Sequence, residues 1–168
     1  MTLLFPAPAA AFLPQEPPMR FLDEALAADD ERATGRLTVR ADSIAVDSTG
    51  LFPSAALLEV MAQTIGIYAG RMRLLAGQRP AAGLLLGTRR AVFSRPGWPV
   101  GTRFTAHAAK TWEGDDGLWQ FDCAVEAEAP GEAPETAAQA VLTVFNPPEN
   151  FFDRARAATA RPASQGES

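Results

Sequence analysis

The sequence predicts an α+β fold in which one long helix packs against one antiparallel sheet. Residues 54–76 are rich in Ala, Leu and Met and repeat apolar side chains at helical spacing, which predicts the helix. The stretches before and after it alternate apolar and polar side chains, which is typical of half-buried strands. Short turns with Gly, Pro or Asp separate the later stretches, so consecutive strands should run antiparallel.

The expected elements are two strands, the helix, and then a meander of strands. Residues 1–18 contain several prolines, which disfavour a helix and predict an irregular lead-in. Residues 1–148 are expected to form one domain, and residues 149–168 a partly disordered tail with a short helix over 150–160. Strands are expected over residues 19–28, 32–40, 83–95, 102–112, 118–128 and 136–145.

The predicted helix carries an unusual polar stripe. Ser54 follows a proline and is a natural N-cap, whose hydroxyl would accept a hydrogen bond from a backbone N–H of the first turn. An acid, an amide and two glycines then fall on one line along the helix: Glu59, Gln63, Gly66 and Gly70. A carboxylate in so apolar a helix is expected to have a hydrogen-bond or ion-pair partner, or a functional role. The two glycines predict close packing against the sheet or a partner helix.

Composition excludes several classes of function. The net charge is −5 and there is no basic run, so nucleic acid is not an expected partner. Cys123 is the single cysteine and His107 the single histidine, so neither a disulfide nor a metal site is expected. The apolar N-terminus lacks the positive region of a signal peptide, and the helix is too charged to span a membrane. A cytoplasmic protein without metal or cofactor is expected.

Several short motifs follow one another along the chain, at residues 13–23, 50–53, 59–63, 85–89 and 98–101. In this order they resemble the 3-hydroxyacyl-[acyl-carrier-protein] dehydratases of the hotdog fold. The nearest resemblance is to the dehydratase-like proteins of aryl-polyene and related polyketide pathways, and it covers roughly residues 12–147. It implies a curved sheet wrapped around the helix, and two active sites at the interface of a dimer whose sheets join edge to edge.

The resemblance also implies a chemistry and a set of partners. The substrate would be an acyl chain linked through phosphopantetheine to acyl carrier protein, dehydrated from the 3-hydroxyacyl to the enoyl thioester in fatty-acid, polyketide or aryl-polyene-type biosynthesis. Glu59 and Gln63 are the expected catalytic residues, with Glu59 acting as acid or base because burial would raise its pKa. Backbone N–H groups at the start of the helix would polarise the thioester carbonyl. The expected substrate-binding residues are Phe52, Ser54, Ala55 and Gly87.

Two departures from the dehydratases leave alternatives open. The family's catalytic histidine position holds Leu51, and the histidine of its N-terminal motif is replaced by Gln15. His107 shares strand parity with polar residues, so it is expected to face solvent. The protein is then either a dehydratase working as a homodimer, or a non-catalytic or half-site subunit of a heterodimer with a histidine-bearing hotdog protein. An acyl thioesterase and a plain acyl-binding module are further alternatives. Arg89 and Arg90 either border the sheet or contact a phosphate of the carrier group.

Overall fold

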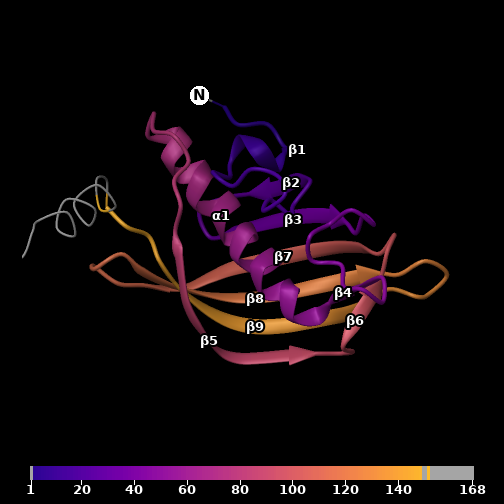
Figure 1. Ribbon diagram of the computed structural model, residues 1–168. Helices are drawn as coiled ribbons and strands as arrows, with labels where there is room; N and C mark the ends of the chain where they lie inside the picture. The colour runs from indigo at the N-terminus through magenta and orange to yellow at the C-terminus, as the bar shows by residue number, and fades with distance from the viewer. Residues whose placement is uncertain (1, 149–150, 152–168) are drawn as a thin grey trace, which may run out of the picture.

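The computed structural model describes residues 2–148 and residue 151, and this part of the chain forms one long helix against a seven-stranded sheet (Figure 1). The predictions of a partly disordered tail over residues 149–168 and a short helix over 150–160 fall, apart from residue 151, outside the described residues. In chain order the elements are β1 (Ala7–Pro8), a 3₁₀ turn (Ala9–Ala11), β2 (Glu24–Ala28), β3 (Arg32–Thr38), β4 (Leu51–Pro53), a 3₁₀ turn (Ser54–Ala56), α1 (Leu57–Leu75), β5 (Leu84–Phe93), β6 (Gly97–Pro99), β7 (Arg103–Glu113), β8 (Leu118–Glu128) and β9 (Glu135–Phe145).

The sheet has the order β1-β2-β3-β7-β8-β9-β5, and every pair of neighbours is antiparallel. The expected meander is wrong at one point, because β5 pairs with β9 and not with β7. Between β5 and β7 the chain passes through β6, which pairs with β4 in a separate two-stranded sheet. This detour returns the chain to β3, so that β7 pairs there and β5 is left at the edge. Neither three-residue strand was predicted, because so short a segment has no readable alternation.

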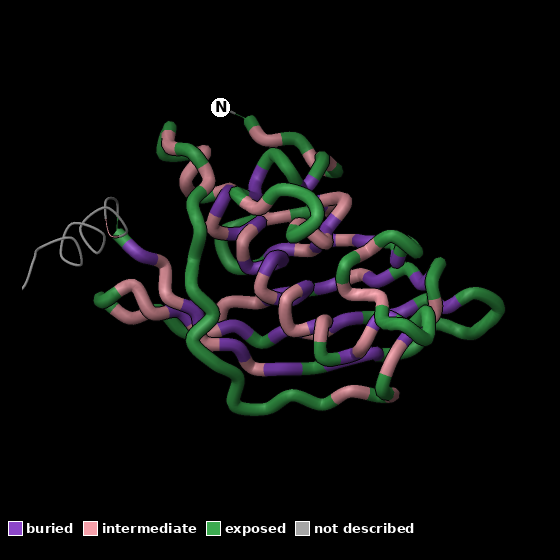
Figure 2. The backbone as a smooth tube through the Cα atoms, in the orientation of Figure 1, coloured by how far each residue is buried: buried purple, intermediate pink, exposed green. Residues whose placement is uncertain are grey.

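The core lies between α1 and the concave face of the sheet. Leu57, Met61 and Tyr68 recur at helical spacing on α1 and are fully buried. On β8, Trp119 and Phe121 alternate with more exposed residues, as the sequence predicted, and both rings pack edge-on against Tyr68 at centroid distances of 5.6 and 5.3 Å. Figure 2 shows the same alternation of buried and exposed residues along the central strands.

The start of the helix differs from the prediction. Ser54 is not the N-cap, because α1 begins three residues later and the serine lies in the preceding 3₁₀ turn without a capping hydrogen bond. Its hydroxyl donates to the backbone oxygen of Arg95 at 2.5 Å and accepts from Nε1 of Trp98 at 3.1 Å. The pairing of β4 with β6 brings these groups beside Ser54, so the hydroxyl bonds across the chain crossing and not to the helix.

The glycines of the polar stripe are close-packing positions, as expected, but the prediction that the sheet or a partner helix packs on them is wrong, because the segment in contact with both is the N-terminal lead-in. A Cβ at Gly70 would lie 2.1 Å from the backbone oxygen of Phe12, and a Cβ at Gly66 would lie 2.7 Å from Cδ2 of Leu13. Phe12 and Leu13 are both buried. The lead-in thus contains a short strand and a 3₁₀ turn, and it packs along the helix at these two glycines.

Strand β5 is exposed along almost its whole length (Figure 2). It is hydrogen-bonded on one side only, to β9, and it ends the sheet. Several of its side chains are large and apolar, and Leu86 and Val92 are 57% and 58% exposed. A long apolar edge strand of this kind is a template for pairing with another chain.

Candidate functional site

Glu59 lies in the first turn of α1 and is half-buried. Its Oε1 accepts a hydrogen bond of 2.9 Å from Nε2 of Gln63, one turn further along the helix. A carboxylate at the N-terminal end of a helix is also favoured by the helix dipole. The structure therefore brings together the two residues expected to be catalytic, in a fixed mutual orientation.

Gln63 is 1% exposed and its amide is fully engaged. Its Oε1 accepts from the backbone N–H groups of Phe21 and Leu22 at 2.9 and 3.3 Å. Its Nε2 donates to the backbone oxygen of Met19 at 2.8 Å as well as to Glu59. An amide has two donor hydrogens and an oxygen with two lone pairs, so no capacity remains for substrate or water. Gln63 joins residues 19–22, which follow the lead-in, to the helix and orients the Glu59 carboxylate.

Glu59 lines a cavity of about 100 Å³ between α1 and the end of the sheet near β5. A liquid water occupies about 30 Å³, and ligand pockets usually measure about 300 Å³ or more. The cavity of one chain therefore admits the reacting end of an acyl group but not a whole acyl-pantetheine. Its apolar lining comes from the helix and from the edge strand with its neighbour: Ile65, Ala69, Leu84, Leu85, Val144 and Phe145.

Gln15 lines the same cavity and was not assigned a role from the sequence. Its backbone oxygen accepts from Nη1 of Arg20 at 2.9 Å, whereas its side-chain Oε1 is buried without a hydrogen-bond partner among the described residues. Buried polar atoms are rarely left in this state. The only sequence signal was its position, where the resembling dehydratases have a histidine.

The four expected substrate-binding residues do not line this cavity. Phe52 is buried in the core, where its ring packs against Phe21 and Phe104. Ser54 is buried, and its backbone N–H donates to the oxygen of Pro96 at 2.8 Å. The two remaining residues are exposed: Ala55 in the turn before α1 and Gly87 on β5.

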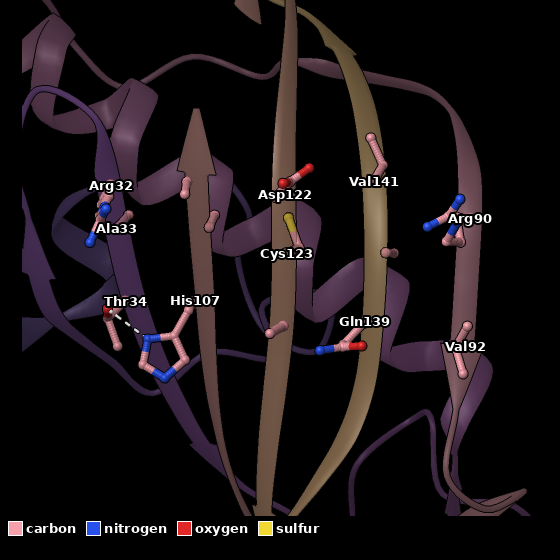
Figure 3. Close-up of a pocket in the computed structure, with 14 residues that line it drawn as sticks. Arg32, Ala33, Thr34, Arg90, Val92, His107, Asp122, Cys123, Gln139 and Val141 are labelled. Carbon is pink, nitrogen blue, oxygen red and sulfur yellow. Dashed lines mark hydrogen bonds between the residues drawn. The ribbon is translucent and has the colours of Figure 1, made fainter. Parts of the chain in front are cut away.

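His107 lies on the opposite face of the sheet from the helix, as its strand parity predicted. It alternates with the buried residues Ala106 and Ala108, and its Nδ1 lies 3.2 Å from Oγ1 of Thr34 (Figure 3). A shallow cavity of about 530 Å³ covers this outer face, with arginines of β3 and β5 at its two ends (Figure 3). It holds the protein's single imidazole but not Glu59, so the two groups expected in a dehydratase site are separated by the sheet.

Cys123 does not supply a nucleophile. It is buried on β8, and burial, assisted by the charge of Asp122, raises the pKa of its thiol to about 12. A thiol that stays protonated at neutral pH is unreactive. Within the described residues, no cluster of three or more His, Cys, Asp or Glu side chains could hold a metal ion, and no helix is long and apolar enough to cross a membrane.

A single helix held against a large curved antiparallel sheet defines the hotdog class of α+β proteins. The chain belongs to the ApeP-like family (ApeP dehydratase), whose pattern matches residues 7–155. Among solved structures it is similar to the dehydratase heterocomplex ApeI:P from Xenorhabdus doucetiae, at 23% identity and a TM-score of 0.76, over 89% of this chain and 97% of that one.

Two further structures share the fold. A hypothetical thioesterase protein with coenzyme A from Streptococcus pneumoniae TIGR4 is 12% identical with a TM-score of 0.55, over 73% of this chain and 83% of that one. The virulence protein Cj0977 from Campylobacter jejuni is 14% identical with a TM-score of 0.59, over 86% and 91% of the two chains. Identities this low establish the fold alone. No curated protein sequence matches the chain.

Proposed function

We propose that the protein takes part in dehydrating 3-hydroxyacyl chains carried on acyl carrier protein, giving the enoyl thioester in fatty-acid, polyketide or aryl-polyene-type biosynthesis. The observation that supports this most strongly is a carboxylate, Glu59, oriented by Gln63 at the wall of a largely apolar cavity. Membership of the ApeP-like family supports the same reaction class. The site of action would be the cytoplasm, and no cofactor is required.

The reaction sets definite demands on the site. A base removes the α-proton, a donor polarises the thioester oxygen, and an acid protonates the 3-hydroxyl so that water leaves. Glu59 is the group that carries a proton. The N–H groups of the turn at Ala55 remain the proposed donors to the thioester oxygen. The remaining proton carrier is not a histidine of this chain, because His107 lies across the sheet and Leu51 occupies the position of the family's catalytic histidine.

A second hotdog subunit would supply what one chain lacks. The cavity is too small for the whole substrate, and its wall includes Leu84 and Leu85 at the start of the exposed edge strand β5. A chain paired along β5 would extend the sheet, cover these leucines and lengthen the cavity. Completion of the site and pairing of the two subunits would then occur at the same surface.

Charge on β5 favours a different subunit over a second copy. Arg89 and Arg90 lie in the middle of the strand. If two copies of β5 paired along their full length, the two-fold axis would pass close to these residues and would gather four arginines. Like charges on adjacent strands destabilise pairing. A partner with acidic residues on its edge strand avoids this cost, and a heterocomplex is also what the similar structure from Xenorhabdus doucetiae contains.

The half-site alternative follows from the same observation. A subunit that contributes Glu59 to a site whose imidazole comes from the partner would be inactive alone and active in the heterodimer. The homodimeric enzyme would be active alone. The thioesterase alternative is supported only by similarity of fold.

Turnover of a 3-hydroxyacyl thioester tests the proposal through the ultraviolet absorbance of the enoyl product. The chain is assayed alone and after co-expression with a histidine-bearing hotdog subunit. Glu59→Gln keeps the shape of the side chain but cannot carry a proton, so kcat should fall about 10²–10⁴-fold with little change in melting temperature. Glu126→Gln, an exposed position on the outer face of the sheet, is the matched control and should retain activity. The proposal fails if neither preparation makes enoyl product, or if Glu59→Gln retains full activity.

A further inference from the structure

The outer face of the sheet, opposite α1 and Glu59, separates positive and negative charge by strand. Strand β3 presents arginine and threonine side chains outward: Arg32, Thr34, Arg36 and Thr38. Strand β8 presents acids, an amide and an alanine outward: Gln120, Asp122, Ala124, Glu126 and Glu128. Of these acids, Glu128 is already paired with Arg103 on β7. A solvated sheet face is expected to be polar, but solvation does not require the two signs to lie on different strands.

The two charged strands do not meet within the chain, because β7 runs between them (Figure 3). Arg32, Ala109 and Asp122 share one row across the sheet. Arg36 and Glu126 are the outer members of another row. Two strand spacings separate the backbones of each pair by about 10 Å. Among the described residues, no ion pair joins β3 to β8.

These four charges have few partners inside the chain. Arg32 and Asp122 are exposed, and neither makes an ion pair within the described residues. Arg36 contacts Glu24 on β2 through one nitrogen at 3.5 Å. The Glu126 carboxylate lies 4.0 Å from the imidazole on β7. Each of the four can therefore take a further partner of opposite charge that approaches from outside.

A second copy of the chain, related by a two-fold axis along β7, would bring the opposite charges together. This axis exchanges β3 with β8, so Arg32 of each copy faces Asp122 of the other. The same operation sets Arg36 against Glu126. Stacked sheets lie about 10 Å apart with their strands nearly aligned, a gap that an arginine and a carboxylate span from opposite sides. An axis along β8 would instead oppose acid to acid, so the charge pattern selects the axis along β7.

We propose that this outer face is a contact between two copies of the chain, held by reciprocal Arg32–Asp122 and Arg36–Glu126 ion pairs. The strip formed by β3, β7 and β8 measures about 15 Å by about 35 Å, so each copy would bury roughly 500 Å². An interface of this size is weak and reversible. The face is distinct from the edge strand β5, so two heterodimers formed along β5 would join through it.

Sedimentation velocity on the chain, at concentrations on the order of 1–100 µM, measures this association. The wild type should associate reversibly, and its Kd should rise with NaCl because the ion pairs lie at the surface. Asp122→Arg sets arginine against arginine twice in each pair of copies, so the Kd should rise at least about tenfold. Asp115→Arg makes the same change of charge in the turn between β7 and β8, so it is the matched control and should associate like the wild type.

An exchange of charges separates this contact from a general effect on the fold. Arg32→Asp should also weaken association by itself, but mixed with Asp122→Arg it should associate, because the facing charges are then again of opposite sign. The proposal is overturned if the wild type stays monomeric, if either variant associates like the wild type, or if their mixture does not associate. The result does not depend on enoyl formation, since Glu59 lies on the helix side of the sheet.

Discussion

Replacing Gln63 by leucine should weaken the attachment of residues 19–22, between the lead-in and β2, to the helix. The amide accepts from the backbone N–H groups of Phe21 and Leu22 and donates to the backbone oxygen of Met19. Leucine has nearly the same volume but no polar atom, so three backbone groups would lose their partners. An unsatisfied buried group costs about 1–3 kcal/mol. Because the Leu22 N–H is buried and the other two groups are partly buried, the total should be about 2–4 kcal/mol.

Thermal unfolding followed by circular dichroism measures this loss. For a chain of 168 residues, 2–4 kcal/mol corresponds to a fall in melting temperature of roughly 5–15 °C. Gln139→Leu, on the exposed outer face, is the matched control and should shift the melting temperature by about 1 °C or less. If Gln63→Leu melts within about 2 °C of the wild type, the three backbone groups do not depend on this amide, and the reasoning about the polar stripe is refuted.

Two further predictions concern the helix and the buried thiol. Gly70→Ala should lower the free energy of unfolding measured in urea by about 1–3 kcal/mol, because its Cβ would lie 2.1 Å from the Phe12 oxygen. At a helix position with free space the same substitution stabilises a protein. A variant that is more stable than the wild type would therefore contradict the close packing at Gly70. Cys123 should resist thiol reagents at pH 8 until the protein unfolds. Because folding raises the pKa of this thiol, its contribution to the free energy of unfolding is complete below the ordinary pKa of 9.0 and is lost as the pH rises toward about 12. The free energy of unfolding of Cys123→Ala should therefore fall less than that of the wild type between these pH values.

The sequence was most informative where a pattern reported local burial. Alternation placed β8 at the residues where the structure has it, and helical spacing located α1 to within a few residues. The alternation of side chains along β7 was enough to place His107 on the face away from the helix, because once one side chain of a strand is assigned to a face, all the others follow.

The sequence misled where a non-local contact decided the outcome. Ser54 looked like an N-cap, but the chain crossing at Trp98 gave its hydroxyl other partners. The neighbour of β5 could not be predicted, because short loops favour a meander and the intervening β6 pairs with a segment more than 40 residues earlier.

The cavity was also beyond reach of the sequence. It combines residues of the lead-in, the helix, β5 and β9, which only the tertiary fold brings together. Glu59 and Gln63 were found because a resembling motif contains them and because a charged group interrupts an apolar helix. Gln15 lies in an irregular proline-rich stretch, where neither period nor composition marks a residue as buried.

The bare backbone of the helix at Gly66 and Gly70 has a consequence for how this protein can vary. The lead-in approaches the helix so closely there that no side chain fits between the two segments, and the absence of side chains on these glycines sets their separation. The same lead-in carries Gln15 to the cavity wall, so Gly66 and Gly70 partly determine the size of the cavity, although only Gly66 lines it. A bulkier residue at Gly70, which is outside the cavity lining, would therefore remodel the chamber from a distance, while the carboxylate itself stayed unchanged.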